Sequence, residues 1–193
     1  MNDGKGIAGR QGRGLTKNRG LCFALISAIL LLPFAAPAIA QMDEYSIKAG
    51  YLYNFSKYVD WPDGAVGAKF VFCIVGDDPF AGKLDQTIAG KTTRDGKPME
   101  VRKIGAEEVK SCQIAFVSRS EKRHIAAILI ATKGATVMTV ADFSPFAESG
   151  GVAGFRLEDN KVKVDLNMDA ANRAALKVSS KLQQVANLVS GGS

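Results

Sequence analysis

The chain contains the stretch Phe70-Val71-Phe72-Cys73-Ile74-Val75-Gly76-Asp77-Asp78-Pro79-Phe80, from which its fold class can be inferred. The apolar run 70–75 is typical of a strand that is covered on both faces, as in a parallel sheet. Asp78 is predicted to cap a helix that begins at Pro79, because proline has no amide hydrogen to satisfy there. That helix should run to about Ala89. A buried strand followed at once by a helix is the unit from which α/β proteins are built.

The alternation of strands and helices continues toward the C-terminus. We expect strands at 99–104, 112–117 and 136–140, a helix at 121–131 opened by a capping box at Ser118 and Glu121, and a short turn or helix at 144–148. The apolar runs 152–157 and 162–166 flank a polar turn and predict an antiparallel hairpin. The sequence therefore predicts a single-domain α/β sandwich with a largely parallel sheet, an antiparallel C-terminal hairpin and helices on both faces. It does not fix the strand order.

The last segment, 169–189, carries apolar residues spaced alternately by four and three and predicts one long helix. Packing of this helix against the sheet is the simpler interpretation. A homodimer seam is the alternative, although fewer than three heptads are too short to argue a coiled coil.

Residues 1–40 have the three parts of a secretory signal peptide. A stretch with five basic residues precedes the apolar run 21–36, and Ala38-Ile39-Ala40 is typical of a cleavage site. A permanent membrane anchor is the weaker alternative, since a span needs roughly 20 apolar residues and this run is shorter and interrupted by Pro33 and Pro37. We therefore expect a cleaved signal peptide at 1–40, a single mature domain at 41–193 and a periplasmic location.

Removal of residues 1–40 changes the charge of the protein. The whole chain has a formal charge of +6, whereas residues 41–193 carry 20 Lys and Arg against 18 Asp and Glu, a net of +2. Nucleic-acid binding, which usually requires a strongly basic domain, loses its main support.

Cleavage also removes Cys22 and leaves Cys73 and Cys112 in an exported chain. An even pair in an oxidising compartment favours one disulfide, with two buried free thiols as the alternative. Two cysteines without a CxxC spacing, in a chain with one histidine, indicate neither a redox enzyme nor a zinc site.

Residues that indicate catalysis are scarce. His124, the one histidine, is expected on the surface of a helix, and no GxSxG nucleophile motif, phosphate loop or dinucleotide turn is present. We therefore predict no catalytic residue, no metal and no cofactor. Asp77 and Asp78 follow a predicted parallel strand, where α/β proteins commonly bind ligands, so they are candidates for a cation or cationic ligand. A helix cap beside an exposed acid is the simpler interpretation.

All four tyrosines and the only tryptophan lie between Tyr45 and Trp61, in a segment that predicts a helix. Ile47, Tyr51, Phe55 and Tyr58 recur at about helical spacing and should pack on the sheet. Tyr53 and Trp61 are the best candidates for exposure and for binding a partner, because aromatic residues are enriched at binding hot spots.

Several blocks together resemble the YfiR family of periplasmic proteins. They are 48–59 (Lys-Ala-Gly-Tyr-Leu-Tyr-Asn-Phe-Ser-Lys-Tyr-Val) with Trp61-Pro62, 72–80, Cys112 with 116–121, Gly150-Gly151 and 174–182 (Ala-Ala-Leu-Lys-Val-Ser-Ser-Lys-Leu). Their order and spacing cover essentially the whole mature chain.

The resemblance implies a non-enzymatic regulator that binds and represses the periplasmic sensor domain of an inner-membrane diguanylate cyclase, which lowers cyclic di-GMP and biofilm formation. It also implies that dimers can form and that envelope redox state is linked to repression. Cys73 and Cys112 match one cysteine pair of the family, whereas a second pair, found in some members near Gly150-Gly151, has no counterpart here. Redox switching through a second bridge is therefore not expected.

Two other classes of function remain open. One is a periplasmic module that binds a small ligand at 76–80. A hydrolase or oxidoreductase has little support beyond the fold class, and a fold alone does not imply a function.

Overall fold

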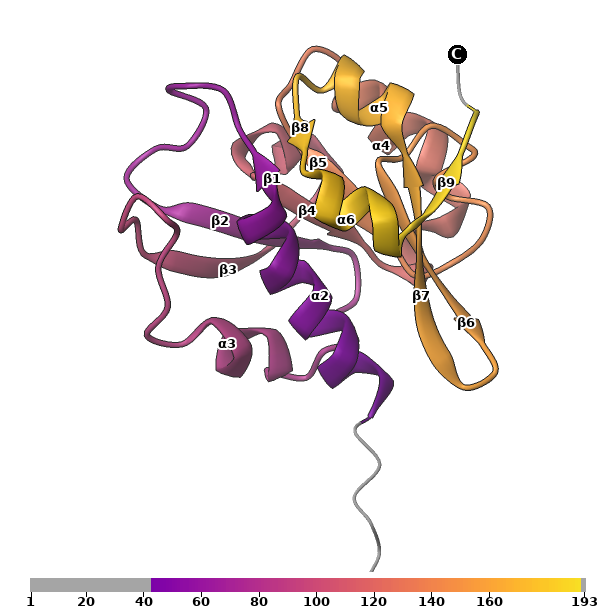
Figure 1. Ribbon diagram of the computed structural model, residues 1–193, viewed down its shortest axis with the longest axis horizontal. Helices are drawn as coiled ribbons and strands as arrows, with labels where there is room; N and C mark the ends of the chain where they lie inside the picture. Colours follow the sequence, from indigo (N-terminus) through magenta and orange to yellow (C-terminus); the bar gives the residue numbers. More distant parts are fainter. Residues whose placement is uncertain (1–42, 192–193) are drawn as a thin grey trace, which may run out of the picture. The chain divides into compact units, whose positions relative to one another are not determined.

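The computed structural model describes residues 43–191, so the predicted signal peptide at 1–40 lies outside the described residues. The described residues form one compact unit. Its helices, 3-10 helices (η) and strands follow in the order α2 (Glu44–Tyr58), β1 (Val59–Asp60), β2 (Phe70–Val75), α3 (Lys83–Ile88), β3 (Met99–Ile104), η2 (Ala106–Ser111), β4 (Ile114–Val117), η3 (Arg119–His124), α4 (Ile125–Ala131), β5 (Met138–Ala141), β6 (Ala153–Glu158), β7 (Lys161–Asn167), α5 (Met168–Arg173), β8 (Lys177–Val178), α6 (Ser180–Val185) and β9 (Asn187–Val189) (Figure 1).

The main sheet has seven strands in the order β3-β2-β4-β5-β6-β7-β9. The first five run parallel to one another, β7 pairs with β6 in the antiparallel direction, and β9 is parallel to β7. A small antiparallel pair, β1 with β8, lies outside this sheet. The predicted α/β class, with a largely parallel sheet and an antiparallel hairpin at β6 and β7, is confirmed.

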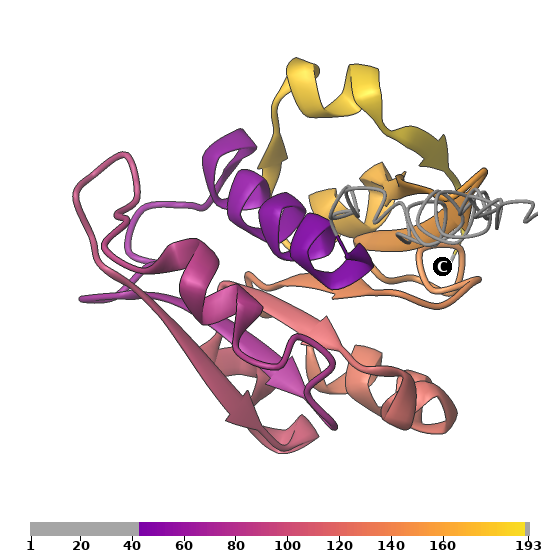
Figure 2. The same cartoon turned by 90° about the horizontal axis from the view of Figure 1, so that it is seen from below.

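Strand β2 is buried on both faces because its side chains alternate between two hydrophobic cores. Phe70, Phe72 and Ile74 join the core beneath α2 and α3, whereas Cys73 and Val75 join the core beneath η2 and α4. Figure 2 shows α2 and α3 on one side of the sheet and α4 on the other. The prediction of helices on both faces is therefore confirmed, and it explains why the strand sequence is continuously apolar.

Helix α2 buries a face that matches the predicted one only in part. Ala49, Leu52 and Phe55 are fully buried, whereas Tyr58 is 38% exposed. Ile47 and Tyr51 pack against the core only partly. Of the predicted stripe only Phe55 is fully buried, and the other fully buried residues, Ala49 and Leu52, are small or aliphatic.

Helix α3 begins later than predicted. Ala81 and Gly82 both have left-handed backbone angles, φ +49° and +83°, so a right-handed helix cannot run through them and begins only at Lys83. Cys112 also differs, because it precedes β4 and caps η2 at its C-terminal end. Where a helix was predicted at 121–131, Ser118 does cap a helix. The six residues after it, 119–124, form the 3-10 helix η3, and α4 begins only at Ile125.

The long helix predicted at 169–189 is wrong. Helix α5 ends in a left-handed turn at Ala175, φ +55°, where the Leu176 amide donates to the Ala171 carbonyl at 3.0 Å. Val178 then pairs with Val59, and Ser179 caps the separate helix α6. The continuous helix needed for the alternative of a homodimer seam is therefore absent from the described residues.

Within residues 43–191, every helix is too short or too polar to cross a membrane.

Candidate functional site

The order of the strands places a topological switch point between β2 and β4. From β2 the chain passes through α3 to β3 on one side, and from β3 it passes through η2 to β4 on the other. In open parallel sheets, ligands commonly bind in the crevice at the carboxyl ends of two such strands. The residues that follow β2 and β4 therefore form the first candidate site, and they include Asp77 and Asp78.

This crevice is filled by the protein's own side chains. Gly76 has φ +87°, and a Cβ atom added to it would lie 2.4 Å from the Ser120 Oγ and 2.8 Å from the Glu121 Cγ. The Asp77 amide donates a hydrogen bond to the Ser120 Oγ at 3.0 Å. Glycine is required at 76 both for its backbone conformation and for this close contact.

The two aspartates at the switch point do not converge on a common centre. One Asp78 carboxylate oxygen accepts from the Phe80 amide at 2.8 Å, and the other pairs with Lys103 at 2.8 Å. The pKa of the Lys103 ammonium is raised, mainly because Lys103 donates a hydrogen bond to Asp78. Asp77 is exposed. Asp78 therefore stabilises the turn and ties it to β3, in place of the helix cap that the sequence predicted.

A buried ionic cluster lies near the same edge of the sheet, and the sequence interpretation missed it. Asp142, directly after β5, has a side chain only 1% exposed and pairs with the equally buried Lys48 at 2.8 Å. The Tyr45 hydroxyl donates to the same carboxylate oxygen at 2.7 Å. Arg119 donates to the Asp142 carbonyl at 2.8 Å, and Lys48 also pairs with Glu44. The cluster connects the N-terminal end of α2 to the residues that follow the carboxyl ends of β4 and β5.

The Tyr45 hydroxyl is held in its neutral form by this environment. Burial and then the hydrogen bond to the Asp142 carboxylate raise the pKa of Tyr45 to about 12. Lys48 also lies 4.4 Å from the centre of the Tyr45 ring. One sequence signal could have located this cluster, because Lys48 occupies the same helix face as Leu52 and Phe55, where a lysine requires a buried partner.

Tyr53 and Trp61 are less exposed than the sequence predicted, since both are half-buried against the hydrophobic core. Trp61 packs edge-on against Phe70 with ring centres 4.9 Å apart, and its indole nitrogen is buried without a partner among the described residues. The sequence could not show that β1 and the loop after it fold back over Phe70. Among the aromatic residues of this segment, Tyr58 is the exposed one, at 38%.

Two lysines flank the Tyr53 ring. The Lys91 ammonium lies 4.1 Å from the ring centre and the Lys57 ammonium 5.2 Å away, which is the geometry of cation–π contacts. Lys57 also donates to the Thr92 carbonyl at 2.7 Å. Tyr53, Lys57 and Lys91 form what we call the Tyr53 patch, in which an aromatic ring is partly covered by positive charge.

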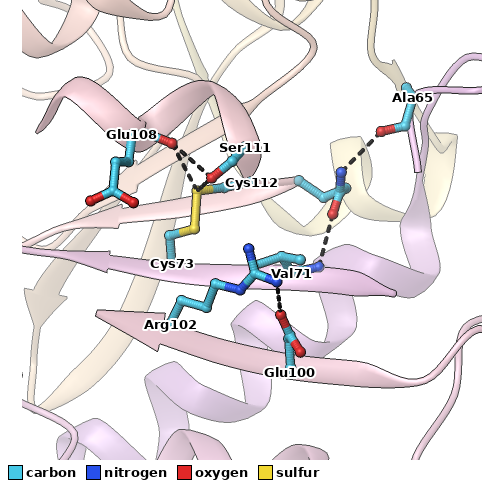
Figure 3. The surroundings of a disulfide bond; sticks show 9 residues. Ala65, Val71, Cys73, Glu100, Arg102, Glu108, Ser111 and Cys112 are labelled. Atoms are coloured by element: carbon cyan, nitrogen blue, oxygen red, sulfur yellow. Dashed lines mark hydrogen bonds and ion pairs between the residues drawn. A yellow bond between two sulfur atoms is a disulfide. The ribbon is translucent and has the colours of Figure 1, made fainter. Parts of the chain in front are cut away.

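Cys73 and Cys112 form a disulfide whose Cα atoms lie 5.9 Å apart (Figure 3). Both residues are 1% exposed. The strand register places Cys73 opposite Ala115, so the bridge connects β2 to the residue that ends η2 and does not join directly opposed strand positions. Gln113 strengthens the same junction, because its side chain accepts from the Val71 amide at 2.8 Å and donates to the Ala65 carbonyl at 2.9 Å.

The remaining titratable groups do not assemble a catalytic or metal centre in the part of the chain that the structure describes. His124 is a surface residue that contacts Glu121 at 2.9 Å. Among residues 43–191, no three His, Cys, Asp or Glu side chains are grouped so that they could hold a metal ion.

Comparisons with known proteins point to one family. A family model described as YfiR/HmsC-like matches residues 45–187, which is well over half of the chain. A comparison with curated proteins finds no match.

Among solved structures, a conserved domain protein from Vibrio cholerae O1 biovar El Tor has a similar fold, with a TM-score of 0.53 and 10% identity over 72% of this chain. The match spans 59% of that protein, which is less than two thirds of its length. A second structure, the ABC domain from Streptococcus pneumonia in complex with L-Trp, has a TM-score of 0.45 and 8% identity, covering 62% of this chain and 55% of that one.

Proposed function

The chain belongs to the YfiR/HmsC-like family of periplasmic regulators of cyclic di-GMP signalling, and on this basis we propose that it binds and represses the periplasmic sensor domain of an inner-membrane diguanylate cyclase. The family match carries the proposal. Repression would lower cyclic di-GMP and biofilm formation. It requires only that the protein bind one conformation of the cyclase more tightly than another, so the mechanism needs no catalytic group.

The proposal includes export of the chain. Residues 1–40 serve as the cleaved signal peptide, and residues 41–193 act in the periplasm as one domain. The buried Cys73–Cys112 bridge agrees with an oxidising compartment. A homodimer stays a prediction from the resemblance to the family, and it would need a surface other than a helix at 169–189.

We place the partner contact on the Tyr53 patch and on Trp61, which follows β1 directly. A half-buried aromatic side chain is held in a fixed position, so it loses little conformational entropy when a partner covers it. Lys57 and Lys91 form no ion pair with a carboxylate within the described residues, and they would attract an acidic surface of the sensor domain.

Substitution of Tyr53 tests this surface. Tyr53→Ala is expected to weaken binding of the sensor domain about tenfold, which is roughly 1.4 kcal/mol, because it removes the ring that the two lysines flank. Tyr53→Phe keeps the ring and should bind as the wild type does. For Trp61 the suitable change is Trp61→Phe, because alanine would also remove the contact with Phe70. Binding is measured by titration calorimetry, and thermal unfolding checks that each variant is folded.

Leu157, which is 55% exposed near the tip of the β6–β7 hairpin, provides a matched control. Leu157→Ala removes a more exposed apolar side chain from a different surface, and the affinity of this variant should be unchanged. If Tyr53→Ala binds as tightly as Leu157→Ala, the contact is on another surface.

Affinity capture from cross-linked cell envelopes tests the function itself. Recovery of a membrane protein with a periplasmic sensor and a cytoplasmic cyclase domain, whose cyclase rate falls when the purified protein is added, is the expected result. A cyclase whose rate does not respond, or capture of the protein alone under conditions that preserve membrane complexes, would contradict the proposal.

A further inference from the structure

A surface cleft of about 590 Å³ lies at the amino ends of β5 and β6, on the edge of the sheet opposite the switch point. Side chains of α4, the following segment 132–137, β5, the loop 149–152 and α5 line it. Its volume falls within the range of roughly 300–1,000 Å³ that is typical of small-molecule sites.

The walls of the cleft are mainly apolar. They include Leu129, Ile130, Val137 and Val152, and Ile130 is 63% exposed. A solvent-exposed isoleucine beside a concave apolar surface favours a ligand that can bury a hydrocarbon or aromatic body there.

The charge of the cleft has one sign. Its lining contains two charged residues, Lys133 and Arg173, and both are basic. Neither forms an ion pair with any carboxylate in the described part of the chain. The lining contains no acidic residue, so these two cations leave a positive potential at the cleft that attracts an anion.

Thr139 adds a polar group to the same cleft. It is 3% exposed, and its hydroxyl oxygen accepts from the Val152 amide at 3.0 Å. The hydroxyl hydrogen reaches no acceptor among residues 43–191 and therefore provides a donor in a largely apolar site.

We propose that this cleft binds a small organic carboxylate with an apolar body, whose negative group pairs with Lys133 and Arg173. The site differs in charge and in place from the one predicted at Asp77 and Asp78, which suited a cation. It does not depend on the identity of the cyclase, because binding is measured on the purified protein alone.

Three probes of equal chain length separate charge from apolar burial. Octanoate, 1-octanol and octylammonium are titrated into the purified protein by calorimetry and by nuclear magnetic resonance, below the concentrations at which they aggregate. Octanoate is expected to bind at one saturable site, 1-octanol about tenfold more weakly, and octylammonium not measurably. The octanoate affinity should fall as salt is raised, because the charged groups are exposed. Equal binding of octanoate and 1-octanol, or no saturable octanoate binding, would overturn the proposal.

Variants locate the site. Lys133→Ala with Arg173→Ala should raise the octanoate Kd about tenfold, since each exposed ion pair is worth up to about a fivefold change. The matched control, Lys110→Ala with Lys122→Ala, removes two cations that do not line the cleft and should leave the Kd unchanged. Ala126→Trp should block the cleft, whereas Ala127→Trp places the same bulk on an adjacent exposed residue outside its lining. Unchanged octanoate binding in Ala126→Trp would show that the ligand lies elsewhere.

Discussion

Lys48 and Asp142 form a buried ion pair on which the attachment of α2 depends. Each side chain is at most 3% exposed, so neither charge is well solvated without the other. Asp142→Asn is expected to lower the free energy of unfolding by about 3 kcal/mol, because Lys48 would then keep only the partly exposed Glu44 as a charged partner. Urea denaturation measures the difference.

The exposed pair Lys69 and Glu100 provides the control for this prediction. The Lys69 side chain is 54% exposed, and Lys69→Met should change the stability by less than about 1 kcal/mol. Similar effects of the two substitutions would mean that the buried pair is no more important than a surface one.

Tyr45 gives the protein a pH dependence at alkaline pH. Its pKa is 10.0 in the unfolded reference and about 12 in the folded protein, so the folded state holds the proton more tightly. The contribution to stability is complete below pH 10 and falls as the pH rises toward about 12. Tyr45→Phe should lose this part of the pH dependence, as measured by urea denaturation between pH 9 and 12. Identical slopes for the variant and the wild type would contradict the assignment.

At the residue scale, the strand β2 could be predicted from the sequence, but a pair of distant residues could not. The apolar run 70–75 correctly predicted β2, since six consecutive apolar residues leave few alternatives. The partnership of Lys48 with Asp142 could not be predicted, because the two residues are 94 positions apart and only the fold brings them together.

At the scale of elements, Ala175 explains why the C-terminal helix is divided. A left-handed residue at this place is usually glycine, so the alanine gave no sign of a helix end. The regular spacing of Ala171, Val178 and Val185 suggested one helix. Pairing of β8 with β1 and capping of α6 by Ser179 outweigh that local preference.

Ala175→Gly should raise the free energy of unfolding by about 0.5–1 kcal/mol, because glycine adopts φ +55° without the clash that a Cβ atom causes. The neighbouring change Ala174→Gly, at an ordinary negative φ, should lower it instead. Thermal and urea denaturation of the two variants check the sign, and a loss of stability in Ala175→Gly would contradict this account of the helix end.

Strands β2 to β7 were predicted more accurately than the helices for a physical reason, whereas β8 and β9 lie where one long helix was predicted. Strands β2 and β4 are short, continuously apolar runs, whereas α3 and α5 are six-residue helices whose ends depend on turns made by alanine or by contacts with distant strands. The aromatic segment was correctly predicted as a helix, but of its predicted buried face only Phe55 is fully buried, because aromatic residues are found at both cores and surfaces.

At the scale of the described chain, the disulfide connects the two sides of the switch point. Replacing Cys73 and Cys112 together by alanine removes a link between residues 39 positions apart. The expected loss is about 4 kcal/mol in the free energy of unfolding, because the unfolded chain regains the entropy of that loop. Urea denaturation of the variant tests this value, and an unchanged midpoint would show that the bridge does not contribute to stability.

The two candidate ligand regions lie at opposite edges of one sheet. Asp77, Asp78 and the ionic cluster are at the carboxyl ends of the parallel strands, whereas the cleft with Lys133 and Arg173 is at the amino ends. The strand order that creates the switch point could not be predicted from the sequence, and neither could a cleft built from three separate segments, 126–139, 149–152 and 170–174.

The Cys73–Cys112 bridge also determines how the chain would respond to mechanical force. If the protein is pulled by its two ends, tension passes directly from β2 to the start of β4 through the sulfur atoms. The segment that contains α3 and β3 then carries no load. The fully extended oxidised chain would be shorter by about 130 Å, since 39 residues at roughly 3.4 Å each stay inside the closed loop. Reduction would release that length, so a single-molecule extension trace reports the oxidation state of each molecule.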